Sequence, residues 1–264
     1  MSSFSAAWLA LREPHDRRAR NAEVLDAVVT AFASHISLNV ADVGCGTGST
    51  YRALSPRLPP GQRWRLYDND LSLLARATGP ADVTTVPLDL ARDLEAALDG
   101  AVDLVTTSAL LDLVSPAWLE RFATEAAARR LPVYAALSYD GRVRLDPADP
   151  LDGRIVAAVN KHQRTDKGFG PALGPAAAQA AIEQFEQLDY AVVQGPSDWV
   201  FQPTDREMQN EILSGWASAA REIDEASLGE ATGWLTRRRE LVSLGRSTIQ
   251  VGHVDFFARP TSRR

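Results

Sequence analysis

The sequence has little cysteine and little lysine: one cysteine occurs in 264 residues, and two of the 28 basic residues are lysines. A single cysteine excludes an intramolecular disulfide and a metal cluster built on cysteine ligands. The sequence also lacks any run of about 18 apolar residues, the length that a membrane-spanning helix needs. Residues 1–10 contain no basic segment followed by a long apolar core, so we expect no secretory signal. These absences predict a soluble, cytoplasmic protein.

Positive charge is also in deficit. Acidic residues number 34 against 28 basic ones, which gives a net charge of −6 and a pI of about 5.3. This balance makes nucleic acid an unfavoured partner, because proteins that bind polyphosphate usually present a basic face. We also expect no metal site, since the four histidines lack the spacing of metal ligands: His15, His35, His162 and His253. The hydrophobic content of 45% is that of an ordinary globular domain.

From residue 37 to residue 137, short apolar runs alternate with helical patterns. The expected strands cover residues 37–43, 63–68, 83–88, 102–107 and 132–137, and the expected helices 71–78, 90–98 and 116–130. Strands that alternate with helices are typical of right-handed βαβ units and a parallel sheet. We therefore predict an α/β fold with a Rossmann-like open, mostly parallel sheet and helices on both faces.

The two ends of the chain give less regular patterns. Residues 4–11 predict a short helix ended by Pro14, and Asp16 is the expected N-cap of a second helix. Residues 141–150, rich in Asp, Pro and Gly, predict a loop. Further helices are expected around 155–159 and over 176–188, 208–223 and 228–244, the last two as a helical insertion near the C-terminus. Strands are expected over 190–193 and 248–258, the final one antiparallel at the far side of the sheet.

A glycine-rich turn follows the first expected strand, in the order Asp42-Val43-Gly44-Cys45-Gly46-Thr47-Gly48. Glycines at such a turn allow positive φ and close approach of a ligand to the backbone. Asp68 closes the second strand, where a carboxylate can accept hydrogen bonds from both ribose hydroxyls of an adenosine cofactor, and Asp89 closes the third. The ordinary alternative is a tight turn, with both acids serving as helix N-caps.

Together these features resemble the class I S-adenosylmethionine-dependent methyltransferases over about residues 16–137. A nicotinamide-binding domain fits less well, because its fingerprint is Gly-x-Gly-x-x-Gly and Asp42 would repel a pyrophosphate. The resemblance implies one domain with N-terminal helices (1–36), a cofactor-binding core (37–140), and substrate-side and cap elements (141–264). It also implies S-adenosylmethionine as cofactor. The residues it places around that cofactor are Asp42, Gly44, Cys45, Gly46, Gly48, Asp68, Asn69, Asp89, Leu90, Ser108 and Arg20.

The acceptor side rests on fewer signals. Asp112, among apolar neighbours just after the fourth strand, and Tyr139, after the fifth, are the predicted catalytic residues; Asp112 could equally be a loop acid or a helix cap. The polar segment 161–167 predicts an anion clamp of His162, Arg164 and Lys167, with a solvated loop as the alternative. We expect methyl transfer to O or N of a small metabolite, which is anionic if the segment acts as a clamp. An RNA or protein methyltransferase and a non-catalytic S-adenosylmethionine binder remain alternatives.

Overall fold

The computed structural model describes residues 4–77, 79, 82–223 and 225–261. Its strands are β1 (Leu38–Val43), β2 (Gln62–Asp68), β3 (Asp82–Pro87), β4 (Leu104–Ser108), β5 (Val133–Asp146), β6 (Tyr190–Pro196), β7 (Trp199–Phe201) and β8 (Thr248–Pro260). They form one sheet in the order β3-β2-β1-β4-β5-β8-β6, and β7 pairs with β8. Neighbours from β3 to β5 are parallel, whereas β8 is antiparallel to β5, β6 and β7. The expected Rossmann-like, mostly parallel sheet with a final antiparallel strand is confirmed.

The helices connect these strands. They are α1 (Ala6–Ala19), α2 (Ala22–Phe32), α3 (Ser49–Leu54), α4 (Leu71–Leu74), α5 (Leu94–Leu98), α6 (Pro116–Ala128), α7 (Asp152–His162), α8 (Ala177–Gln187), α9 (Arg206–Glu222) and α10 (Leu228–Ser243). The helices α4 and α5 are each four residues shorter than expected, and the expected end of α4 at Thr78 lies outside the described residues. None of the described helices is both long enough and apolar enough to cross a membrane.

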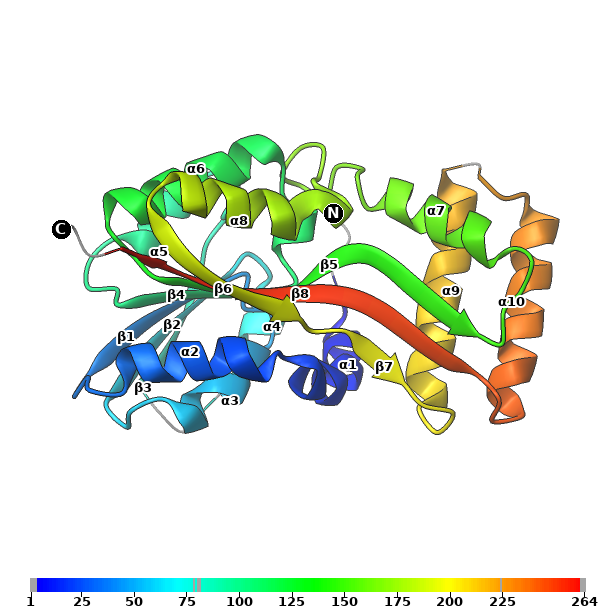
Figure 1. Cartoon of the computed structure of the whole chain (residues 1–264), viewed down its shortest axis with the longest axis horizontal. Helices are drawn as coiled ribbons and strands as arrows, with labels where there is room; N and C mark the ends of the chain where they lie inside the picture. Colours follow the sequence, from blue (N-terminus) through cyan, green and yellow to red (C-terminus); the bar gives the residue numbers. More distant parts are fainter. Residues whose placement is uncertain (1–3, 78, 80–81, 224, 262–264) are drawn as a thin grey trace.

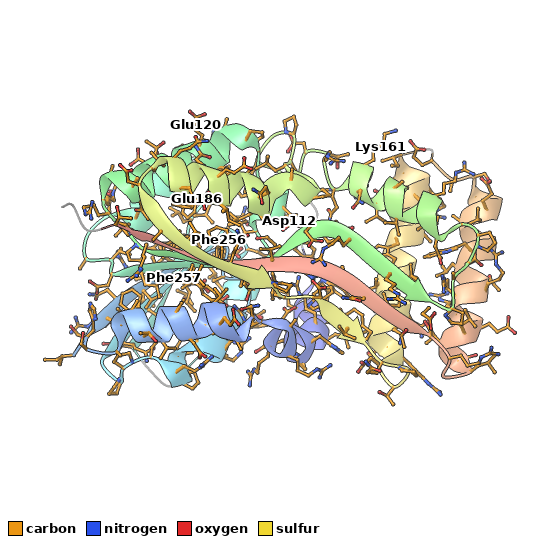
Figure 2. The ribbon with its side chains drawn as sticks, in the orientation of Figure 1. Asp112, Glu120, Lys161, Glu186, Phe256 and Phe257 are labelled. Carbon is orange, nitrogen blue, oxygen red and sulfur yellow. The ribbon has the colours of Figure 1, made fainter. Side chains whose placement is uncertain are left out.

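Helices cover both faces of the central sheet (Figure 1). One apolar core lies under α5, α6 and α8, and a second lies under α2 and α3. Phe256 and Phe257, successive residues of β8, alternate between these two cores (Figure 2). The chain runs outward from β1 to β3 and then returns across β1 to β4. This reversal places a topological switch point between β1 and β4, where open α/β sheets form their ligand crevice.

The sheet extends beyond the central layers into a region that we call the wing: the outer halves of β5 and β8, with β7, α7, α9 and α10 (Figure 1). A third apolar core fills it, and Phe201 and Trp234 are fully buried there. Arg238 is also fully buried, where it pairs with Asp152 and donates to the carbonyl of Pro147 at 2.6 Å. The wing therefore carries the expected helical insertion on strands that continue from the central sheet.

The structure corrects the expected break at Pro14, because α1 continues to Ala19. Proline inside a helix removes one hydrogen bond and costs about 3 kcal/mol, so tertiary contacts must offset it. Asp16 is correspondingly not an N-cap: it is buried within α1 and binds Trp199 of the wing. Asn21 caps α2 instead, accepting from the N–H of Val24 at 3.0 Å.

The structure also corrects the loop expected over 141–150. β5 continues to Asp146 and pairs with β8, after a bulge between Tyr139 and Val143 where Gly141 has a φ of 86°. A bulge inserts residues into a strand without ending its pairing. Residues typical of a turn, such as Gly141, can therefore occur inside a strand. The short β7 was not expected. The last strand is antiparallel as expected, but it lies between β5 and β6 rather than at the far side of the sheet.

Candidate functional site

A pocket of about 660 Å³ opens at the carboxyl ends of β1, β2 and β4, beneath α1. Its position is the switch point of the sheet, and its volume is in the range of small-molecule sites. The lining comes from α1 and the residues before it, from the segments after β1 to β4, and from the loop after α7. The lining residues are Phe4, Leu9, Arg12, Asp16, Gly44, Cys45, Gly46, Thr47, Ser49, Thr50, Asp68, Asn69, Asp70, Leu71, Ser72, Leu73, Leu88, Leu90, Ser108, Ala109, Leu110, Leu113, Lys167 and Phe169.

The glycine turn forms the floor of the pocket. Gly44, Gly46 and Gly48 have φ values of 70°, 53° and 84°, which residues with a Cβ rarely adopt. A Cβ on Gly46 would also lie 3.1 Å from Cδ1 of Leu9 in α1. Both the backbone conformation and the packing of α1 therefore favour glycine at position 46.

Hydrogen bonds hold this turn against the end of β2. The N–H groups of Gly44 and Cys45 donate to the carbonyl of Tyr67 at 2.9 and 3.0 Å. The N–H of Gly46 donates to Oδ2 of Asp68 at 2.8 Å. Burial raises the pKa of the Cys45 thiol and so favours its protonated form. The turn and the acid predicted beside it are thus joined directly.

The acids at the ends of β2 and β3 have different surroundings. Asp68 and Asn69 line the pocket, and Asp68 also accepts a hydrogen bond from the N–H two residues further on, at 3.0 Å. Asp89 is exposed and lies outside the lining, and its Oδ1 accepts from the N–H two residues further on, also at 3.0 Å. Leu90 beside it does line the pocket. Among the described residues, no three His, Cys, Asp or Glu side chains are grouped to hold a metal ion.

A buried acid and a buried arginine lie behind the glycine turn. Oδ1 of Asp42 accepts from Thr106 Oγ1 at 2.7 Å, whereas Oδ2 has no hydrogen-bond partner among the described residues. Burial raises the pKa of Asp42 to about 7, against the opposing effects of Thr106 and Arg20. Arg20 is buried as well and donates to Tyr134 Oη at 3.1 Å and to Ser108 Oγ at 3.5 Å. The arginine thus approaches the pocket through Ser108.

The two predicted catalytic residues both lie outside the lining of the pocket. Asp112, in a 3-10 turn over Leu111–Leu113, is buried where β5 leaves the central sheet (Figure 2). Burial raises its pKa to about 6, and the charge of Arg12 opposes the shift. Its Oδ1 has no hydrogen-bond partner among the described residues. Tyr139 packs in the wing, where its hydroxyl donates to Oδ1 of Asn160 at 2.7 Å.

Of the predicted anion clamp, Lys167 and His162 are in contact, Nζ to Nδ1 at 3.4 Å, but they differ in their relation to the pocket. Lys167 lines the pocket, and its Nζ donates to Thr165 Oγ1 at 2.9 Å. It forms no salt bridge with any carboxylate in the described part of the chain. His162 pairs instead with Glu222 of α9, Nε2 to Oε2 at 2.9 Å, and Arg164 is exposed outside the lining. The structure therefore brings one of the three residues into the pocket.

Known proteins resemble this chain in fold rather than in sequence. No family model and no curated protein matches the sequence. A cyclopropane-fatty-acyl-phospholipid synthase-like protein from Lactobacillus casei has a TM-score of 0.54 at 13% identity, over 97% of this chain and 94% of that one. A type II methyltransferase, provisionally so described, from Anaeromyxobacter dehalogenans has a TM-score of 0.50 at 14% identity, over 90% and 96%. The chain has the class I S-adenosylmethionine-dependent methyltransferase fold. The YcgJ protein of Bacillus subtilis is similar too, with a TM-score of 0.53 at 14% identity over 92% and 100%.

In this methyltransferase fold, α1 supplies lining residues that the sequence did not reveal. Leu9, Arg12 and Asp16 of α1 line the pocket, together with Phe4, which precedes the helix. The three residues of α1 are spaced by three and four positions, which places them on one face of a helix. This spacing indicates a shared helix face only if the helix continues through Pro14. The sequence pattern predicts that the helix ends there, so it does not group these residues.

Proposed function

We propose that the protein binds S-adenosylmethionine in the pocket and transfers its methyl group to O or N of a small, anionic metabolite. The observation that carries the proposal is the hydrogen bond from the N–H of Gly46 to Asp68. It joins the glycine turn to an acid of the pocket wall at the switch point of a methyltransferase fold. Two features seen separately in the sequence thus form one cradle.

The side chains around this cradle suit the parts of the cofactor. Asp68 would accept hydrogen bonds from the ribose hydroxyls, and the apolar Leu88 and Leu90 would pack against the adenine. The open backbone at Gly44 and Gly46 would lie along the amino-acid portion. Asp89 remains a proposed adenine contact from the resemblance, although its side chain is exposed outside the lining.

Charge favours this cofactor over a nicotinamide dinucleotide. Asp68 and Asp70 line the pocket, and Asp42 lies buried behind the turn with one oxygen that has no hydrogen-bond partner in the described part of the chain. A pyrophosphate there would meet carboxylates in a partly desolvated site, where repulsion is weakly screened. S-adenosylmethionine carries an ammonium and a sulfonium instead, which Asp42 would stabilise. The orphaned oxygen of Asp42 therefore fits a cationic ligand.

The other end of the pocket suits the acceptor. When bound, the cofactor supplies an electrophilic methyl group, so the protein must orient the acceptor and exclude water. Leu110, Leu113 and Phe169 provide apolar walls, and Lys167 provides a cation free of carboxylate partners within the described residues. We propose that Lys167 attracts an anionic group, and that Asp112 takes a proton from acceptors that are protonated at working pH.

Calorimetry tests the cofactor. We expect S-adenosylmethionine and S-adenosylhomocysteine to bind and NAD not to bind; a preference for NAD would refute the proposal. Incubation with methyl-labelled cofactor and a metabolite extract tests the reaction. We expect label in small molecules retained on an anion-exchange column. Label in RNA or protein would establish a different acceptor, and binding without any transfer would establish a non-catalytic binder.

A further inference from the structure

The guanidinium of Arg12 is held in one orientation by two neighbours. Its Nε donates to Oδ2 of Asp16 at 2.9 Å, one turn further along α1. Its Cζ lies 4.9 Å from the ring centroid of Trp199 in β7. The indole N–H of Trp199 donates to Oδ1 of the same Asp16, also at 2.9 Å. The three side chains thus form a closed, buried support that links α1 to the wing.

This support leaves the functional end of Arg12 unused. Neither terminal nitrogen makes a hydrogen bond within the described residues, although Arg12 lines the pocket. A guanidinium that is stacked on an aromatic ring and fixed through Nε presents two parallel N–H donors, the geometry that matches a carboxylate. We propose that Arg12 binds a carboxylate group of the methyl acceptor, with Asp16 and Trp199 as its positioning residues.

The position of Arg12 favours the acceptor over the carboxylate of the cofactor itself. The proposed ribose site is at Asp68, on β2, whereas Arg12 packs on Trp199 of β7 and lies close enough to influence Asp112 after β4. In the sheet, β1 and β2 lie on one side of β4, and β5 and β8 lie on the other. Because β7 pairs with β8, Arg12 packs on the side of β4 that is opposite to Asp68. Asp16 offsets the charge of Arg12, whereas Lys167 forms no salt bridge with a carboxylate of the described residues. Arg12 would orient the carboxylate of the acceptor, and Lys167 would attract it electrostatically.

The inference rests on the proposed function, so the test first measures S-adenosylhomocysteine binding by calorimetry. If S-adenosylhomocysteine does not bind, the proposed function is refuted. The test of Arg12 is then the same titration with benzoate and benzamide, carried out on the free protein. The protein saturated with S-adenosylhomocysteine is then titrated with benzoate and with benzamide, its neutral analogue of the same shape. We expect benzoate to bind and benzamide to bind at least tenfold more weakly. Equal binding of the two, or binding of neither, would overturn the inference.

Variants assign this preference to Arg12. We expect Arg12→Gln to weaken benzoate binding at least tenfold, and Arg12→Lys to recover only part of it, because lysine lacks the planar pair of donors. Trp199→Phe, which keeps a ring but loses the donor to Asp16, should weaken benzoate binding by a smaller factor. Arg18→Gln is the matched control: Arg18 is exposed on the same helix and lies outside the pocket lining. An equal loss in Arg18→Gln would contradict a role for Arg12.

One further comparison separates the two sources of a carboxylate. 5′-Methylthioadenosine resembles S-adenosylhomocysteine but lacks its amino-acid end. If Arg12 serves the acceptor, Arg12→Gln should leave the affinities for both nucleosides within twofold of the parent protein. A loss confined to S-adenosylhomocysteine would show that Arg12 binds the cofactor carboxylate, and the inference would be wrong.

Discussion

Glu13 of α1 and Arg52 of α3 form an ion pair through two hydrogen bonds, Nε to Oε1 at 2.7 Å and Nη2 to Oε2 at 2.6 Å. The third nitrogen of Arg52 donates to the carbonyl of Thr47 at 2.5 Å. This hydrogen bonding lowers the pKa of Glu13. A single guanidinium therefore connects the helix that covers the pocket with the glycine turn that forms its floor.

Replacing Arg52 by lysine should weaken cofactor binding. Lysine keeps the charge but cannot bind Glu13 and Thr47 at the same time in this planar arrangement. We expect Arg52→Lys to cost about 1–2 kcal/mol in S-adenosylhomocysteine affinity, measured by calorimetry, with a smaller loss of unfolding free energy. Arg17→Gln is the control, since Arg17 meets Glu13 at 3.6 Å from an exposed position and should cost less than about 0.5 kcal/mol. Equal effects of the two changes would mean that Arg52 does not position the turn.

The two acids predicted to hold the adenosine should differ in importance. Asp68 lines the pocket and binds the N–H of Gly46, so Asp68→Ala should lower S-adenosylhomocysteine affinity by about 1–3 kcal/mol. Asp89→Ala should lower it by less than about 1 kcal/mol, because the Asp89 side chain is exposed and bonded to its own loop. Calorimetry on both variants gives the comparison. A loss at Asp89 as large as that at Asp68 would show that Asp89 turns inward to the adenine.

The alternating core and the glycine turn could be predicted because their causes are local. Apolar runs such as 102–107 and the glycines at 44, 46 and 48 specify strand and turn within a few residues of chain. The position of Asp68 followed from the end of β2. Parallel pairing of β1 with β2 is then sufficient to bring the turn and Asp68 together.

The remaining features depend on contacts that are distant in sequence. Trp199 binds Asp16 across 183 positions, and this contact helps keep α1 helical through Pro14. The strand β5 continues beyond Gly141 because its residues after the bulge also pair with β8. Neither partner can be identified from the residues around Pro14 or Gly141 alone. Arg12, which depends on the Trp199 contact, was missed for the same reason.

Asp42 should make both stability and cofactor binding depend on pH. Its pKa is about 7 in the folded protein, against an ordinary value of 3.8, because burial disfavours the charge. Its contribution to stability is therefore complete below about pH 3.8 and is lost as the pH rises through 7. The ammonium group of S-adenosylhomocysteine favours the ionised form of Asp42, so this ligand should bind with proton release and more tightly as the pH rises toward 7.

The variant Asp42→Asn isolates this effect, since the amide does not titrate. We expect the pH dependence of S-adenosylhomocysteine affinity between pH 5 and 8, at most about tenfold per unit for one proton, to shrink in Asp42→Asn. 5′-Methylthioadenosine, which lacks the ammonium, should show less pH dependence with the parent protein. Identical pH profiles for the parent protein and the variant would contradict the assignment.

Asp112 and Tyr139 should respond differently to removal of their polar groups. Asp112 has a pKa of about 6 and an oxygen, Oδ1, without a hydrogen-bond partner in the residues that the structure describes, so a base role predicts a methylation rate that rises with pH through about 6. Asp112→Asn should lower that rate and flatten its pH profile.

Tyr139→Phe should keep the rate and lose about 1 kcal/mol of unfolding free energy, because the hydroxyl of Tyr139 donates a hydrogen bond to Asn160 in the wing. The rates are measured on the acceptor fraction that takes label, with S-adenosylhomocysteine affinity as the control for folding. An unchanged pH profile in Asp112→Asn, or a rate lost in Tyr139→Phe with intact cofactor binding, would reverse the assignment of the two residues.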